Sequence, residues 1–399
     1  MKSLKKVLYV LLILVFCGIF LKSCIRRDVP EENVMKYSSG TSVLRVKFPE
    51  ESKTKTINGV DYLQSQSNIG KFGGVFVTST IGEGPKTFNP YTSQDATSST
   101  MSEMMYDGLV TTEPKSGQVV PKLAKSFSIS KDGKIYTFNL RHGIKWSDGK
   151  PITSDDVYFT WNDIIFAGLG NTATRDSLII DGKLPKIVKV DKYTVKFITN
   201  KPFAPFLRTL GVPIAPKHVF APAVKKGEKY FDSFLGTTTP PRDFVVSGAF
   251  KIKEYLAAQR VVFERNPNYY EINTKNQKLP YLNKIIYLIV GDLNNEILKF
   301  EAGELDAISL QGANVGRYKK KEKKSNYKIY NIGADTSTMF VIFNMNTRKD
   351  DKGKFYVNPV KQKWFNDLNF RTAVDYAIDR KDMINNVASG VEQPLFTAE

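Results

Sequence analysis

The sequence predicts an α/β protein with two lobes and mixed sheets. Segments in which apolar and polar residues alternate, as in strands, are interspersed with segments of helical period. The apolar run 285–290 ends at Gly291-Asp292, and a helical pattern, residues 294–302, follows it. We expect the chain to pass there from a first lobe, residues 70–290, to a second lobe, residues 291–399. Two lobes that close by a hinge favour a ligand cleft between them.

Composition and charge narrow the class of protein. The chain has 399 residues, of which 41% are apolar and 12% aromatic, so it can bury sizeable cores. Its formal net charge is +18, but the lysines are spread over the whole length. The dense basic run 317–324 is predicted to be a solvated helix or loop face, because no nucleic-acid motif accompanies it. We therefore expect no nucleic-acid partner.

The N-terminus has the form of an export signal. Three lysines precede an apolar run, residues 7–21, which is shorter than the ~20 residues that span a bilayer as a helix. Leu21-Lys22-Ser23-Cys24 resembles a bacterial lipobox, which implies that residues 1–24 are a lipoprotein signal and that Cys24 becomes the acylated N-terminus of the mature protein; Lys22 departs from the usual pattern. An uncleaved signal anchor is the alternative. In both cases the body is exported and held at a membrane.

Polar residues 25–69 follow the leader and are predicted to form a tether, with a short strand at 43–48. Cys17 and Cys24 are the two cysteines of the chain, so the folded body has neither a disulfide nor a catalytic thiol. The body begins with residues 75–78, whose apolar pattern predicts a buried strand. The glycine-containing segment 82–90 lacks the residues of a phosphate loop, and we interpret it as a turn that lets the backbone approach a ligand.

A hairpin-rich subdomain is expected at about 95–235. It begins with a helix at 98–109. Asp132-Gly133 then separates two alternating runs, which predicts a hairpin with positive φ at both turn residues. Thr153-Ser-Asp-Asp156 has the form of a capping box that begins a helix. The predicted buried faces are Tyr136, Phe138 and Leu140 in the hairpin and Val157, Trp161, Ile164 and Ile165 in the helix.

Further elements follow from the same patterns. They are a polar loop at 168–177, a hairpin at 188–197, a short helix at 203–210, a buried strand at 339–344, an amphipathic helix at 367–378 and a second helix that Gly390 ends.

Several of these segments resemble the family 5 extracellular solute-binding proteins, the peptide- and nickel-type substrate receptors of ABC importers. "KWSDGKPITSDDVYFTW", residues 145–161, and "FRTAVDYAIDRKDMI", residues 370–384, carry the resemblance, which extends from about residue 71 to 390. Residues 246–250 depart from the family pattern. The resemblance implies a type II periplasmic-binding-protein-like architecture. Because family members continue well beyond this length, the second lobe is expected to be incomplete.

The resemblance also implies a function. The protein would capture a short peptide in the cleft and deliver it to an ABC permease, as a monomer without cofactor, at the periplasm or cell surface. The candidate ligand contacts are Glu83, Gly84, Arg175, Asp176, Phe340 and Asn344. The simpler interpretations are a solvated Arg175-Asp176 pair and a Phe340 in the core.

Other functions are weighed against this one. A receptor of the same fold for a nickel or metal chelate or an oligosaccharide, and a peptide-sensing lipoprotein without transport, both stay open. His142 and His218 are the two histidines, which disfavours direct nickel coordination, and no cysteine- or histidine-based metal site is expected. The sequence contains neither Gly-x-Ser-x-Gly nor His-Glu-x-x-His, so we do not expect an enzyme.

Overall fold

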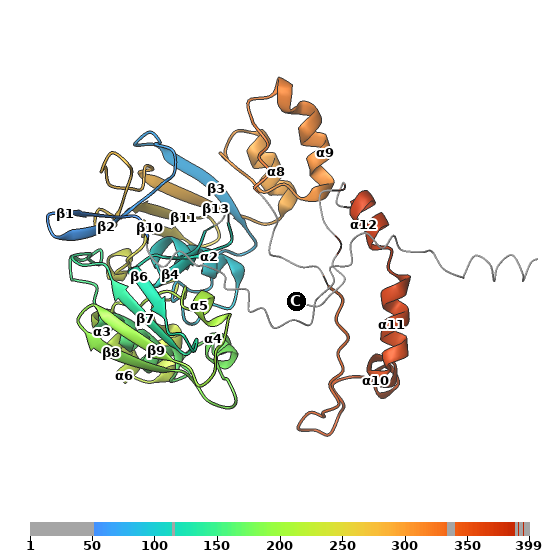
Figure 1. Ribbon diagram of the computed structural model, residues 1–399. Helices are drawn as coiled ribbons and strands as arrows, with labels where there is room; N and C mark the ends of the chain where they lie inside the picture. Colours follow the sequence, from blue (N-terminus) through green and yellow to red (C-terminus); the bar gives the residue numbers. More distant parts are fainter. Residues whose placement is uncertain (1–51, 114–115, 333–339, 388–389, 391–393, 395–399) are drawn as a thin grey trace, which may run out of the picture. The chain divides into compact units, whose positions relative to one another are not determined.

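A computed structural model describes residues 52–113, 116–332, 340–387, 390 and 394 (Figure 1). These residues belong to one compact unit of the chain. The predicted leader, Cys24 and the strand at 43–48 lie outside the described residues.

A mixed four-stranded sheet carries the strands that matter most for the site. Its order is β10 (Phe250–Leu256), β11 (Arg260–Arg265), β13 (Lys284–Val290) and β3 (Val75–Ile81). β13 is antiparallel to β11 and parallel to β3. The predicted strand at 285–290 is confirmed. The prediction of a buried strand at 75–78 was wrong, because β3 is an edge strand that pairs on one side, and Val75 is 47% exposed.

The hairpin-rich part forms a second, antiparallel sheet with the order β6 (Ala124–Ile129), β7 (Ile135–Leu140), β9 (Thr194–Ile198) and β8 (Lys186–Asp191). Both predicted hairpins are present, and the predicted face of β7 is buried. The turn differs from the expected one, because Gly133 has a φ of 70° and Asp132 does not have a positive φ. The loop is longer than two residues, and such loops need one left-handed residue after a type I turn.

The predicted capping box begins a helix as expected. Thr153 N–H donates to Asp156 Oδ2 at 2.9 Å, and the Thr153 hydroxyl accepts from Asp155 N–H at 3.3 Å. The helix α3 (Ser154–Phe159) continues as a π-helical turn, Thr160–Ile165. The four predicted apolar residues of this helix are all buried.

A small sheet replaces part of the predicted tether. β1 (Thr54–Ile57) and β2 (Val60–Gln64) form a hairpin, and β12 (Glu271–Ile272) pairs with β2 in parallel. Asn58 and Gly59 have φ values of 49° and 77°, as a two-residue turn requires. The assignment of residues 54–64 to a tether therefore differs from the structure, which places them in the folded body.

The remaining elements connect these sheets and cover them. They are α2 (Ala96–Met105), β4 (Val110–Thr112), β5 (Val119–Pro121), α4 (Ala173–Ser177), α5 (Phe206–Thr209), α6 (Lys217–Lys225), α7 (Glu228–Ser233), a 3₁₀ turn (Pro241–Asp243), α8 (Leu293–Glu301), α9 (Gly312–Lys321) and a second 3₁₀ turn (Glu322–Lys324). The expected helices at 98–109 and 203–210 are thus present in shorter form.

A largely buried ionic cluster joins β12 to Asp107, which precedes β4, and to Lys122, which follows β5. Lys122 Nζ pairs with Glu271, lies 3.8 Å from Asp107 Oδ1 and donates to the Tyr269 hydroxyl at 2.9 Å. Tyr270 O–H donates to Asp107 Oδ2 at 2.8 Å. Burial raises the pKa of Asp107 above its usual range, against the attraction of the Lys122 ammonium. The cluster leaves none of these charges alone in the interior, which is the condition for tolerating them there.

Residues 340–387 form three helices, α10 (Pro359–Asn366), α11 (Leu368–Ala377) and α12 (Arg380–Val387). The predicted buried strand at 339–344 was wrong for its described residues: they form no strand, and Phe340 is 76% exposed. An apolar run becomes a buried strand only when a neighbour pairs with it, and no described residue does so.

The predicted helix at 367–378 is confirmed, but none of its residues is buried. Gly390 has a φ of 72°, and its N–H donates to Ile384 O at 3.0 Å, as a helix-ending glycine does.

Candidate functional site

The carboxyl ends of β3 and β13 lie at the same edge of the mixed sheet, because the two strands are parallel. Gly82 N–H donates to Val290 O at 2.8 Å and holds the two ends together. Beyond β13, the Asp292 side chain caps α8 by accepting from Asn295 N–H at 2.9 Å. Ligands of open α/β sheets bind outside the carboxyl ends of such strands. This edge is therefore the candidate site.

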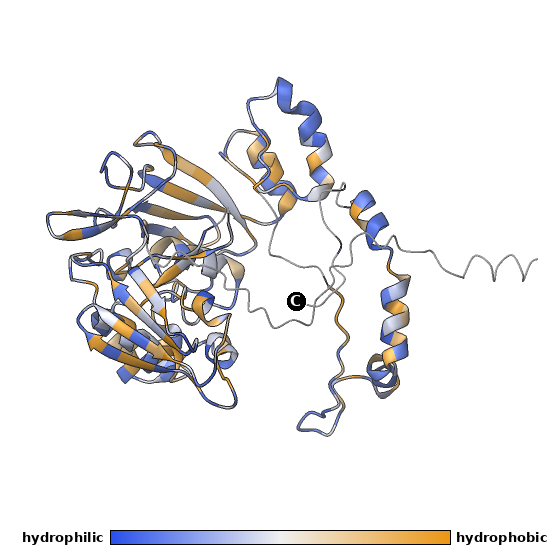
Figure 2. Ribbon diagram, viewed as in Figure 1, coloured by the Kyte–Doolittle hydropathy of each residue, from blue (hydrophilic) through white to orange (hydrophobic). Residues whose placement is uncertain are grey.

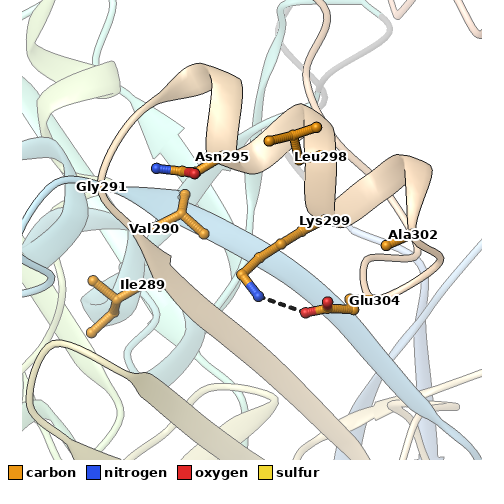
Figure 3. A pocket seen from close by; sticks show the side chains of 8 residues that line it. All are labelled: Ile289, Val290, Gly291, Asn295, Leu298, Lys299, Ala302 and Glu304. Atoms are coloured by element: carbon orange, nitrogen blue, oxygen red, sulfur yellow. Dashed lines mark hydrogen bonds and ion pairs between the residues drawn. The ribbon is translucent and has the colours of Figure 1, made fainter.

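A hollow of about 490 Å³ lies between the end of β13 and α8 (Figure 3). Its lining is Ile289, Val290, Gly291, Asn295, Leu298, Lys299, Ala302 and Glu304. The Lys299 ammonium and the Glu304 carboxylate pair at 2.5 Å on one side of it. The charges of this pair cancel, so the hollow offers mainly aliphatic contacts and the Asn295 amide.

The outer edge of β3 is open over a short length. Gly82 N–H and Gly74 C=O bond toward β13, so the even-numbered residues of β3 direct their backbone groups inward and the odd-numbered residues direct theirs outward. Asp306 occupies the outward groups of Val77: its Oδ2 accepts from Val77 N–H at 2.7 Å, and its own N–H donates to Val77 O at 2.8 Å. The outward groups of Ser79 and Ile81 have no hydrogen-bond partner among the described residues.

Acidic side chains surround this open edge. Glu296, which is 7% exposed, accepts from the Ser79 hydroxyl at 2.5 Å. Glu83 follows β3 after Gly82, and Asp306 lies against Val77. Within the described part of the chain, no lysine or arginine forms an ion pair with any of these three acids. In a chain of net charge +18, the edge of β3 is thus a local negative region.

Two of the predicted ligand contacts lie at this edge. Glu83 is exposed, and Gly84 is buried with a φ of 89°. A Cβ at Gly84 would lie 2.6 Å from Ile289 Cδ1, so Gly84 packs against a residue that lines the hollow. The turn thus packs closely against Ile289, and its approach to a ligand stays a prediction.

Arg175 and Asp176 lie elsewhere, on the short helix α4. Arg175 Nη1 is 3.9 Å from Asp176 Oδ1, and Asp176 Oδ2 accepts from the Thr172 hydroxyl at 2.9 Å. Arg175 Nε is buried without a hydrogen-bond partner in the described structure. No described contact joins this pair to Glu83 or Gly84.

The two candidates from the second lobe make only local contacts. Phe340 is exposed, and Asn344 Oδ1 accepts from Asn346 N–H at 3.1 Å. The ring that packs in this segment is Phe343, whose centroid lies 5.2 Å from that of Phe365. Phe340 is therefore not a core residue in the described structure.

Sequence reasoning missed Ser79, Ile81, Glu296 and Asp306. One signal was present: Thr78-Ser79-Thr80 places three hydroxyl side chains in succession, which is unusual for a strand buried on both faces. The role of Asp306 had no such signal, because its partner Val77 is far away in the sequence.

Both histidines have a partner side chain. His142 stacks on Tyr193 with 4.3 Å between ring centroids, and His218 Nε2 lies 2.8 Å from Asp148 Oδ2. Residues 52–332 and 340–387, apart from the gap at 114–115, contain no group of three or more acidic, histidine or cysteine side chains that could hold a metal. In the same part of the chain, no helix combines the length and the apolar character needed to cross a bilayer.

Known proteins similar to this chain agree on its class. "Probable ABC transporter-binding protein" of Deinococcus radiodurans is 32% identical over 324 residues, which cover 78% of this chain and 52% of that protein. Oligopeptide-binding protein AppA of Bacillus subtilis is 27% identical, and the aligned residues cover 82% of this chain and 54% of AppA. The chain thus spans about half the length of these curated relatives.

Solved structures show the same fold. The structure of Bacillus subtilis AppA in complex with a nonapeptide matches with a TM-score of 0.60 and 26% identity, over 82% of this chain and 58% of that one. The protein MelB of Agrobacterium fabrum in complex with stachyose matches with a TM-score of 0.63 and 21% identity, over 88% of this chain and 60% of that one. The predicted type II periplasmic-binding-protein fold is confirmed by these matches and by the mixed sheets.

A family model also matches most of the chain. The model for "Bacterial extracellular solute-binding proteins, family 5 Middle" matches residues 118–398. The chain therefore belongs to the family 5 bacterial extracellular solute-binding proteins.

Proposed function

We propose that the protein is the substrate-binding receptor of an ABC importer and that it captures short peptides for delivery to a membrane permease. The observation that carries this proposal is the open edge of β3, where the outward backbone groups of Ser79 and Ile81 have no partner among the described residues. An extended peptide can add to such an edge as a further strand, because its own N–H and C=O groups have the matching spacing. Because such pairing uses only main-chain atoms, it is compatible with many peptide side chains, which is what a receptor for varied peptides requires.

The charges around the edge favour the same ligand class. A peptide carries an ammonium group at its N-terminus, and Glu83 and Glu296 supply carboxylates near β3 that form no ion pair with a described residue. The names of relatives point in this direction too, since AppA is an oligopeptide-binding protein. MelB holds an oligosaccharide on a similar fold. A sugar has no main chain to pair with a strand, so the open edge favours the peptide.

The remaining parts of the proposal concern the whole protein. We assign residues 70–290 to one lobe and residues 291–399 to part of the other, with the ligand held between them by contacts and without chemistry. We further propose that the receptor works as a monomer and is held at the membrane through Cys24. Arg175, Asp176, Phe340 and Asn344 remain candidate contacts in this scheme, and Glu83 and Gly84 form its β3 side.

Replacing Ser79 by proline tests the open edge. Ser79→Pro removes one outward N–H and leaves the inward ladder to β13 intact, because proline is tolerated on the free side of an edge strand. We expect peptide affinity to fall between about twofold and about tenfold, the worth of one hydrogen bond. Calorimetric titration of the full chain with a mixture of short peptides measures this change.

Ser79→Ala is the matched control. It also loses the hydrogen bond to Glu296 but keeps the backbone N–H. The alanine variant should bind peptides more tightly than the proline variant, and thermal melts should confirm that both fold. Equal peptide affinities for the two variants would show that this edge does not pair with the ligand.

A further inference from the structure

A cluster of lysines, four of which form no ion pair with a described residue, lies on α9 and the 3₁₀ turn after it. Residues 317–328 contain six lysines and one arginine against one glutamate. We call Lys320, Lys321, Lys323 and Lys324 the lysine face; all four are exposed. Figure 2 shows this part of α9 as strongly hydrophilic.

The neighbouring acids are already occupied. Glu322 accepts from Ile329 N–H at 2.8 Å and pairs with Lys319 at 2.9 Å. These two contacts hold the pKa of Glu322 below its usual range, so it stays charged and engaged. Glu301 forms an ion pair with Arg317 at 2.7 Å. Among the described residues, the lysine face therefore has no ion-pair partner.

Helix α9 packs against α8 through a buried tyrosine. Tyr318 is 2% exposed, and its ring centroid lies 5.5 Å from Tyr327 and 6.3 Å from Phe300 on α8. This aromatic contact packs Tyr318 of α9 against α8, while the four lysines of the lysine face stay exposed. Close by in the sequence, Tyr330 is 72% exposed and Ile332 is 94% exposed.

We propose that the lysine face binds the anionic headgroups of a phospholipid bilayer. Lysine is a flexible point charge, suited to a diffuse negative surface, whereas specific pairing favours the planar fork of arginine. Tyr330 and Ile332, exposed and shortly after Lys324 in the sequence, suit the interface, where amphipathic and apolar side chains enter the headgroup layer. Soluble polyanions share the charge but offer no apolar layer for these two side chains. The contact would orient the body on the membrane, which goes beyond ligand capture.

Vesicle binding by the full chain tests this proposal. The test variant carries Lys320→Gln, Lys321→Gln, Lys323→Gln and Lys324→Gln, since glutamine preserves helix propensity. The control variant carries Lys183→Gln, Lys186→Gln, Lys225→Gln and Lys229→Gln, four exposed lysines without ion pairs among the described residues. Both variants lose the same net charge. Vesicles of phosphatidylcholine alone report any binding through residues 7–21, which every variant shares.

We expect the test variant to bind vesicles with about 30% phosphatidylglycerol at least tenfold more weakly than the unchanged chain at about 0.1 M salt. The control variant should lose less than about threefold in affinity for the same vesicles. Higher salt should remove the difference in affinity between the two variants. Equal losses in the two variants would overturn the proposal. So would unchanged vesicle binding of the test variant together with lost binding to polyphosphate or duplex DNA, which would assign the face to a soluble polyanion. Peptide affinity should be unchanged in the test variant, so this result does not depend on the receptor function.

Discussion

Asp61 illustrates how single residues hold the N-terminal hairpin to the body. Its carboxylate accepts from the Thr56 hydroxyl at 2.6 Å and from His142 N–H at 3.3 Å, and it lies 3.3 Å from Lys125 Nζ. Burial opposes the charged form, but the hydrogen bonds and the lysine outweigh it and hold the pKa of Asp61 below its usual range.

This shift gives a pH-dependent prediction. Because the pKa of Asp61 is lower in the folded state, its stabilising effect is present above about pH 4 and is lost as the pH falls through the folded-state pKa. Asp61→Asn turns an amide N–H toward the hydrogen-bond donors of Thr56 and His142. It should lower the free energy of unfolding by about 1–3 kcal/mol near pH 7. Melting curves should show this deficit shrinking below about pH 4. A deficit independent of pH, or an equal one in the exposed-site control Asp232→Asn, would contradict this account.

Gly84 gives a second prediction at the level of one atom. An alanine there would place its Cβ 2.6 Å from Ile289 Cδ1, at a φ of 89°. Gly82 also has a positive φ, of 100°, but a Cβ there would meet nothing within 4 Å. Gly84→Ala should therefore destabilise the protein by about 1–3 kcal/mol more than Gly82→Ala, as overpacking does. Denaturant unfolding measures the difference, and adding Ile289→Val, which removes Cδ1, should recover part of it. Equal losses at the two glycines would refute the contact.

At the scale of elements, the sequence best predicts the segments whose structure is specified by residues within the segment. The hairpin at 124–140 and the helix from Ser154 need only a turn, an alternation and a capping box, all of them local. The hairpin at 54–64 also had a local signal, since Asn58-Gly59 favours its turn. It was missed because the polar surroundings resemble a tether.

Elements that depend on distant neighbours are predicted less well. The apolar pattern at 75–78 is the same for a central and an edge strand, and only pairing with β13 on one side decides between them. The run at 340–344 has the pattern of a strand but no described partner. The candidate site follows the same rule: Glu83 and Gly84 were found from a local turn, whereas Glu296 and Asp306 meet β3 only through the fold.

At the scale of the whole molecule, burial is uneven along the chain. Residues 340–387 contain a single buried side chain, Val357, whereas the sheets and helices before them share a large core. Large apolar side chains such as Trp364 and Leu368 are 52% and 67% exposed in this part. Exposed apolar surface of this extent is typical of segments that pack against a further partner.

This contrast predicts the course of limited proteolysis. Trypsin should cut the 399-residue chain first at lysines and arginines within 340–387, because local opening costs little where few side chains are buried. A fragment that retains residues 52–332 should persist, and mass spectrometry of the digest identifies it. Earlier cleavage at the lysines of β10 or β13 would show that the core is no more stable than the helices that follow it.

The pairing of β3 with β13 also sets the time at which this sheet can form during synthesis of the chain. These strands are neighbours in space but lie about two hundred residues apart in sequence, and the same holds for β2 and β12. A ribosome that adds ~5–20 residues per second needs on the order of 10–40 s to reach β13 after β3. Asp306, which covers the outward groups of Val77, is made later still. A newly made chain therefore holds β3 without any strand partner for that interval, and the sheet that presents the open edge assembles late in synthesis.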